Sequence, residues 1–145
     1  MDEVIILAPD LSNETELPFV DGGIKAGFPS PAQDYALDSL DINSVLITNK
    51  ASSFYAHVVG DSMLPGIEEG DYVLVDRSID PFQNCIAVCY INNEFNIKRL
   101  DLSEKEDKKV IRLISDNPKY APIIITPDDN FIIWGVVKYA IHKTI

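Results

Sequence analysis

Short apolar runs of β-type residues follow one another at close spacing from residue 54 onward, and this spacing constrains the fold more than any other feature. The runs are rich in Val, Ile, Tyr and Phe, which strands favour, and turn residues separate them. The pattern predicts a mainly β protein with a compact, largely antiparallel fold. The predicted strands are Phe54–Val59, Tyr72–Asp76, Cys85–Ile91, Glu94–Leu100, Val110–Ser115, Ile123–Thr126 and Phe131–Ile141.

The segments between and before these strands carry weaker signals. Asn92-Asn93 predicts a two-residue hairpin turn, because asparagine tolerates positive φ. The mixed charge run from Ser103 to Lys109 predicts a solvated loop. Short N-terminal helices are expected at Ser30–Tyr35, where a serine cap precedes a proline, and at Asp41–Ile47.

The N-terminal segment differs from the rest of the chain. Residues Met1 to Ala26 hold six acids and one lysine, with prolines and glycines that interrupt helices. We predict an extended, partly mobile arm over residues 1–26 and one β-rich domain over residues 27–145. The one apolar stretch of this arm runs from Val4 to Ala8, and its role stays open.

Charge and hydropathy narrow the classes of partner. The net charge is −11, with 12 basic against 23 acidic residues, which argues against direct nucleic-acid binding and favours a partner with a basic face. No apolar run approaches the roughly 20 residues that a membrane-spanning helix needs. Acids also stand at the N-terminus, where a secretory signal carries basic residues. We therefore expect a cytoplasmic protein without membrane contact.

The two cysteines fit that compartment. Cys85 and Cys89 lie four apart in a predicted strand, so their Cα atoms would be about 13 Å apart, too far for a disulfide. Two cysteines and two distant histidines also make a poor metal set. We interpret both thiols as small core residues and expect neither a metal nor another cofactor.

A single serine follows the first predicted strand at a sharp corner. Gly60 ends the apolar run, Ser62 comes next but one, and Pro65-Gly66 prevents a long helix from continuing. A serine held on such a corner projects its hydroxyl from a fixed backbone, as nucleophilic catalysis requires. Gly-Asp-Ser is also ordinary turn chemistry, so an inert surface turn is the competing interpretation.

Lys98 is the matching candidate for a general base. Strand alternation places Phe95 and Ile97 on one face of the second hairpin strand and Lys98 on the other. A lysine there is commonly just solvated. In an apolar cleft near Ser62, burial would instead disfavour the ammonium form and leave a neutral amine that can take the serine proton.

A Ser-His-Asp triad is the other possibility for this serine. His57 precedes Ser62 by five residues on the incoming strand, and His142 is near the C-terminus. Nothing nearby is expected to orient either imidazole, so the Ser-Lys variant, which needs no third member, is favoured.

Five ordered blocks cover nearly the whole chain from Gly22 onward: Ala26–Tyr35, Gly60–Met63 with Gly66–Asp76, Glu94–Leu100, Ser115–Ile123 and Trp134–Val137. Together these blocks resemble the LexA/UmuD family of self-cleaving proteins. The short arm and the Gly-Phe-Pro-Ser-Pro-Ala segment look like UmuD rather than LexA, because no DNA-binding domain precedes them.

The resemblance implies self-proteolysis by a β domain of the LexA/UmuD C-terminal type. Ser62 would be the nucleophile, Lys98 the base and Ala26-Gly27 the scissile bond, with the backbone N–H groups of Ser62 and Met63 as oxyanion donors. It further implies stimulation by the RecA filament on single-stranded DNA, acting as a co-protease. The trimmed product would be a homodimer that joins a UmuC-type DNA polymerase subunit in error-prone lesion bypass.

Two departures from the family pattern accompany the resemblance. Asn84-Cys85 stands where members often have Gly-Asp before the hairpin strand, which could alter the loop entering it. The scissile pair is Ala26-Gly27, as in LexA-type members, rather than the Cys-Gly of the best-known UmuD. Without the resemblance, Ala26-Gly27 would be a plain flexible linker.

Other functions remain open. The main alternative is a non-catalytic polymerase-accessory module with an inactive dyad and a partner-binding tail. A signal-peptidase-like enzyme would need a membrane anchor, which we do not expect. A phage or mobile-element repressor fragment is disfavoured by the lack of a DNA-binding domain.

Overall fold

The computed structural model describes residues 2–12, 17–20 and 37–145. The chain divides into two units. One unit comprises residues 1–9 with 49–145, and the other comprises residues 10–48. The predicted helix at 30–35, the Ala26-Gly27 pair and the predicted domain boundary lie outside the described residues, so these three stay predictions.

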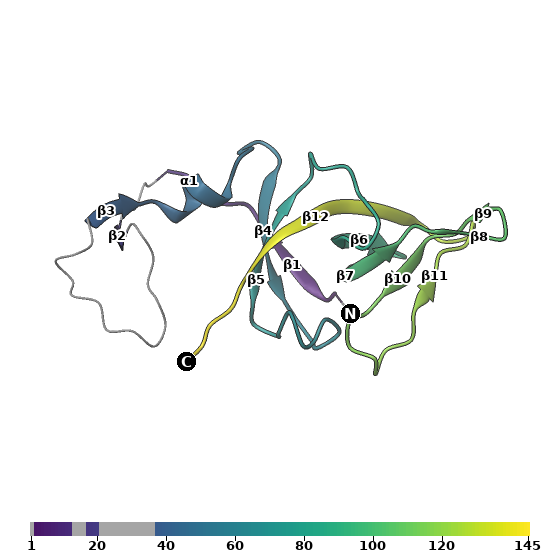
Figure 1. Cartoon of the computed structure of the whole chain (residues 1–145). Coiled ribbons are helices and arrows are strands. Elements are labelled where there is room, and N and C mark those ends of the chain that lie inside the picture. Colours follow the sequence, from purple (N-terminus) through teal and green to yellow (C-terminus); the bar gives the residue numbers. More distant parts are fainter. Residues whose placement is uncertain (1, 13–16, 21–36) are drawn as a thin grey trace. The chain divides into compact units, whose positions relative to one another are not determined.

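The larger unit is built on one eight-stranded sheet in which all neighbouring strands are antiparallel, as the sequence predicts. The long strand β12 crosses the sheet and pairs first with β6, through its N-terminal half, and then with β5 (Figure 1). In sheet order the strands are β1 (Val4–Leu7), β4 (Ser53–Val58), β5 (Tyr72–Asp76), β12 (Phe131–Ile141), β6 (Ile86–Ile91), β7 (Glu94–Asp101), β10 (Arg112–Ile114) and β11 (Ile123–Ile124). Each predicted strand has a counterpart among them.

Within this eight-stranded sheet, β1 is the strand that the sequence does not predict. It comes from the apolar run of the N-terminal arm and pairs with β4, with Val4 opposite Val58 and Leu7 opposite Tyr55. Val4 is buried, whereas Ile5 and Leu7 are exposed, so the strand presents one face to the core. The start of the arm is thus part of the main sheet.

The core of the larger unit consists of two clusters of buried side chains. The first joins β1, β4, β5, β6 and β7 to the turn after β4, through Val4, Ala56, Val58, Met63, Ile67, Val73, Val75, Val88 and Ile97. The second cluster holds Cys85 and Cys89, both buried free thiols, which confirms their interpretation as core residues.

Asparagines adopt left-handed backbone conformations at two turns of this sheet. Asn92 and Asn93, with φ of 47° and 70°, form the predicted hairpin turn between β6 and β7. Asn84, with φ of 66°, precedes β6 at the position where family members often have glycine. Asparagine tolerates this conformation better than most residues, so the departure leaves the entry into the strand intact.

Gly135 permits a close approach within the sheet. A Cβ atom at this position would lie 2.6 Å from a methyl carbon of Val75. The register of β12 against β6 shifts between Ile133 and Gly135, which marks a β-bulge. β12 can therefore bend across the sheet without a clash against β5.

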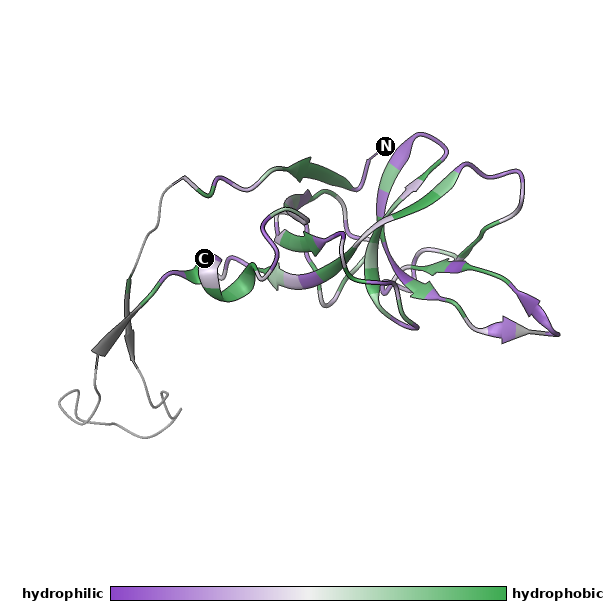
Figure 2. Ribbon diagram, turned by 90° about the horizontal axis from the view of Figure 1, so that it is seen from above, coloured by the Kyte–Doolittle hydropathy of each residue, from purple (hydrophilic) through white to green (hydrophobic). Residues whose placement is uncertain are grey.

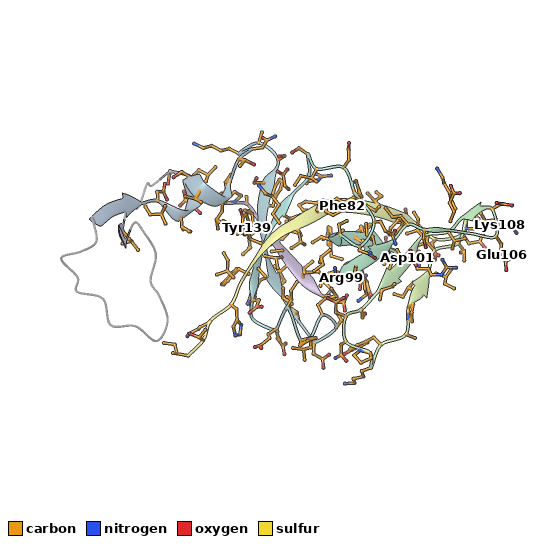
Figure 3. All side chains as sticks on the ribbon, in the orientation of Figure 1. Phe82, Arg99, Asp101, Glu106, Lys108 and Tyr139 are labelled. Atoms are coloured by element: carbon orange, nitrogen blue, oxygen red, sulfur yellow. The ribbon has the colours of Figure 1, made fainter. Side chains whose placement is uncertain are left out.

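The predicted loop from Ser103 to Lys109 is instead a small hairpin. β8 (Glu104–Lys105) pairs with β9 (Lys108–Lys109), and Glu106 and Asp107 form the turn with φ of 54° and 60°. Two positive φ values close a tight hairpin whose twist matches its strands. The charge run masked this turn in the sequence. The hairpin is hydrophilic, and Glu106 and Lys108 lie at its tip (Figures 2 and 3).

The described residues of the smaller unit include a strand pair and a short helix. β2 (Leu17–Val20) pairs antiparallel with β3 (Leu37–Leu40), and the sequence predicts neither strand. α1 (Ile42–Leu46) begins at Asp41, whose side chain accepts a hydrogen bond from the Asn43 backbone, so the predicted helix at 41–47 is confirmed. No helix among the described segments has the length and apolar character to cross a bilayer.

Candidate active site

Ser62 lies in a turn that begins where β4 ends. Gly60 has φ of 86°, a conformation that glycine adopts without strain, and this reverses the chain before the serine. Ser62 is 4% exposed, and the next residue, Met63, is inserted into the first core cluster. The Ile67 N–H donates to the Met63 carbonyl at 3.1 Å, which closes the far end of the turn. The serine therefore has a fixed backbone.

The loop from 115 to 120 supports this turn from outside. Asn117 donates its backbone N–H to the carbonyl of Ser62 and its side-chain Nδ2 to the carbonyl of Asp61, both at 3.0 Å. The Tyr120 hydroxyl donates to the Asp61 carboxylate. This hydrogen bond holds the pKa of Asp61 below and that of Tyr120 above their ordinary values. The sequence analysis assigned no role to these residues.

A second contact fixes the same loop to β7. Arg99 donates from Nε and Nη2 to the two carboxylate oxygens of Asp116, at 2.8 and 2.7 Å, and from Nη1 to the Asn84 carbonyl. Arg99 projects from the middle of β7 (Figure 3). The strand that carries Lys98 is thus linked through Asp116 and Asn117 to the turn that carries Ser62.

Lys98 is buried rather than solvated. It lies on β7 opposite Ala87 of β6, and only 4% of the residue is exposed. Its Nζ donates to the carboxylate of Glu3 at 2.6 Å. Burial is thus observed, whereas a position beside Ser62, the other half of what a catalytic lysine needs, stays a prediction.

Glu3 is a residue of this site that the sequence analysis missed. Its N–H donates to the Phe95 carbonyl of β7, and its carbonyl accepts from the N–H of Val59, both at 2.8 Å. Its carboxylate accepts from the Ile97 N–H as well as from Lys98. Glu3 thus joins β7 to Val59, which follows β4 and precedes Ser62 by three residues. The only signal in the sequence is an acid in front of an apolar run, which is far too common to indicate a site.

No hydrogen bond joins the two candidate catalytic side chains, Ser62 and Lys98, among those of the described residues. The amine of Lys98 donates to Glu3. The backbone N–H groups of Ser62 and Met63, the candidate oxyanion donors, donate to no other group in the described part of the chain.

The histidines have partners that the sequence did not indicate. His142 Nδ1 lies 2.8 Å from Asp71, and Nε2 lies 3.6 Å from Glu68, so the expectation that no group orients this imidazole is wrong. The hydrogen bond to Asp71 raises the pKa of His142. In the described part of the chain, no hydrogen bond joins His142 to Ser62, and both ring nitrogens lie beside carboxylates. His57 stacks on Tyr72, with ring centroids 4.9 Å apart.

Known proteins are similar in sequence to this chain over most of its length. A model of the family described as Peptidase S24-like matches residues 18–138. Protein ImpA of Salmonella typhimurium is 38% identical over 121 residues, covering 83% of this chain and 79% of the relative. Protein SamA of Salmonella typhimurium strain LT2 is 34% identical over 143 residues, covering 97% and 96%. The LexA repressor of Stenotrophomonas maltophilia is 34% identical over 125 residues, covering 86% of this chain but 56% of the repressor.

Proposed function

The chain belongs to the Peptidase S24-like family, the LexA/UmuD-type family of self-cleaving serine peptidases, and we propose that it cuts itself between Ala26 and Gly27. In this proposal Ser62 is the nucleophile and Lys98 is the general base. The burial of Lys98 supports it most: lysines are almost never fully buried unless they are paired, and this buried pair lies in the unit that also holds a buried serine on a fixed turn.

The proposed reaction is an acyl transfer followed by hydrolysis. Neutral Lys98 takes the proton of Ser62 Oγ as this oxygen attacks the carbonyl carbon of Ala26. The N–H groups of Ser62 and Met63 stabilise the oxyanion that forms. Lys98 then gives the proton to the nitrogen of Gly27, and the C–N bond breaks. A water molecule, activated by the same amine, hydrolyses the ester between Ala26 and Ser62.

Intact mass spectrometry tests this assignment directly. The chain is incubated with RecA, ATP and single-stranded DNA, and a fragment beginning at Gly27 is expected. Ser62→Ala and Lys98→Ala should each remain at 145 residues. Lys108→Ala, which removes an exposed lysine of the β8–β9 hairpin, should cleave like the parent. A Gly27 fragment from either dyad variant contradicts the assignment.

The family places the protein in an SOS-related, self-cleaving class, and we propose its partners from the same resemblance. The RecA filament would stimulate cleavage, and the trimmed chain would form a homodimer that joins a UmuC-type polymerase subunit in the cytoplasm. The net charge of −11 supports protein partners with basic faces over direct nucleic-acid binding. Failure of the parent chain to cleave would favour the non-catalytic accessory module.

A further inference from the structure

We infer that residues 2–7 form a built-in inhibitory strand, in which the carboxylate of Glu3 holds the amine of Lys98 and keeps it from acting as a base. This inference rests on the proposed function, because it assigns a regulation to the same lysine. It concerns the N-terminal end of the arm, well separated in sequence from the scissile pair.

The contact between Glu3 and Lys98 blocks the chemistry of a general base. A lysine can take a proton only through a free lone pair on Nζ, and an ammonium paired with a carboxylate has none. The Nζ of Lys98 and the Oε1 of Glu3 are 2.6 Å apart, in the range of a charge-assisted hydrogen bond. The side chains of the two residues are 5% and 19% exposed, so water screens the pair weakly.

The backbone fixes the carboxylate of Glu3 in place. Glu3 is hydrogen-bonded on both sides of its peptide unit, to Phe95 of β7 and to Val59 after β4. The next residue, Val4, is 1% exposed in the first core cluster, and the strand then continues along β4. Glu3 therefore reaches Lys98 from a strand that the sheet and the core both hold.

Part of the edge of β7 is not covered by a neighbouring strand. β10 pairs with β7 only from Arg99 to Asp101, and in the described part of the chain no strand pairs with the earlier part of β7 on that side. The N–H groups of Phe95 and Ile97 donate instead to the carboxylates of Asp2 and Glu3, at 2.8 and 3.3 Å. Such N–H groups are the ones that an added peptide strand uses. Asp2 and Glu3 thus occupy both the amine and a strand-binding edge.

Glu3 lies on the N-terminal side of the proposed cut, so the inhibition would apply to the uncut chain. Glu3 precedes Ala26-Gly27, so the proposed cut would separate it covalently from the domain that carries Ser62 and Lys98. Before the cut, the inhibitory strand is present at the high effective concentration of an intramolecular ligand. Release of this strand would therefore have to precede each cleavage event.

Self-cleavage without RecA provides the first test. Glu3→Gln retains the length and the acceptor oxygen of the side chain but removes its charge, and should raise the basal rate about ten- to hundredfold. Glu69→Gln makes the same change in net charge at an exposed site and should leave the rate unchanged. A Glu3→Gln rate equal to that of the parent overturns the inference while the proposed function stands.

Labelling of Lys98 provides a test that does not depend on cleavage. In a Ser62→Ala background, reductive methylation mapped by mass spectrometry reports how readily each amine reacts. Glu3→Gln should increase the methylation rate of Lys98 about tenfold, with exposed Lys119 as the internal reference. An unchanged Lys98 rate overturns the inference. If Glu3→Gln increases the methylation rate of Lys98 but the parent chain never cleaves, the contact between Glu3 and Lys98 is supported and only the proposed function is contradicted.

Discussion

Arg99 and Asp116 form a two-pronged ion pair, with each carboxylate oxygen within 2.8 Å of a guanidinium nitrogen. The pair connects the two halves of the candidate site. Arg99 follows Lys98 on β7, and Asp116 precedes Asn117, which holds the backbone of Ser62. The distance between the proposed nucleophile and base therefore depends on a contact that includes neither of them.

Substitution of Arg99 should weaken this connection. In Arg99→Lys the positive charge remains, but an ammonium cannot donate two parallel hydrogen bonds to one carboxylate. We expect a loss of about 1 kcal/mol in the free energy of unfolding, because the pair is partly exposed. The rate of RecA-stimulated cleavage should fall about tenfold, beyond what the lost stability explains.

Urea titration and single-turnover cleavage on the same samples would measure both effects. Arg77→Lys is a matched control, since Arg77 is an exposed arginine that stacks on Trp134 and donates to its carbonyl. It should affect stability without affecting cleavage. Full activity of Arg99→Lys would show that the link to Asp116 does not position the site.

Stability should depend on pH through His142. The hydrogen bond to Asp71 raises the folded-state pKa of His142 above its unfolded value of about 6.5. A raised pKa means that the folded chain binds the proton more tightly, so this stabilisation is complete below pH 6.5 or so and is lost as the pH rises through the folded value. Midpoints of urea denaturation should therefore fall across and above neutral pH.

His142→Gln removes the titrating group and should flatten this part of the profile. His57→Gln removes the other histidine, which stacks on Tyr72, and should leave the slope unchanged. If the slope persists in His142→Gln, another group causes it. Because His142 is far from fully buried, the effect should appear as a modest shift of the midpoint.

Both thiols should be inert in the folded chain. Burial raises the pKa of Cys89 to about 12, so almost no thiolate exists near neutral pH, and Cys85 is buried in the same cluster. Iodoacetamide at pH 8 should modify neither thiol in the native protein and both in urea, as mass spectrometry would show. Rapid native labelling of Cys89 would mean that the second core cluster opens readily.

The local part of this structure is readable from the sequence, and the long-range part is not. Period-two runs between turn residues locate the strands from β4 onward, and Asn92-Asn93 locates a hairpin, because these signals lie within a few residues of the structure they specify. The contact between Lys98 and Glu3 spans 95 positions. No local period encodes such a pairing, so the burial of Lys98 could be stated only as a condition.

Asp116 and Asn117 show the same limit within the candidate site. Their block was recognised as part of the family pattern, but a loop sequence does not indicate which backbone carbonyls it will contact. The hairpin at Glu104–Lys109 was not predicted for a different reason. The segment is dominated by charged residues, and its turn depends on two residues with positive φ. Charge predicts exposure there correctly, but it does not predict pairing.

Val4 offers a way to release the inhibitory strand without touching Glu3. Val4→Ala removes two buried methyl groups and should cost about 2 kcal/mol of unfolding free energy. It should also raise the basal cleavage rate and the methylation of Lys98, because a strand with less buried surface leaves the sheet more often. The cleavage rate is measured without RecA, and the methylation of Lys98 is measured in the Ser62→Ala background.

Val73→Ala separates strand release from general loosening. Val73 is as fully buried as Val4 and belongs to the same core cluster, but it lies on β5 rather than on the inhibitory strand. The same deletion there should cost a similar free energy and leave Lys98 methylation at the parent rate. If Val73→Ala accelerates methylation and cleavage as much as Val4→Ala does, loss of core packing alone exposes the amine. Glu3 would then be a passive neighbour of Lys98, because an inhibitory strand requires the effect to follow the strand that carries the carboxylate.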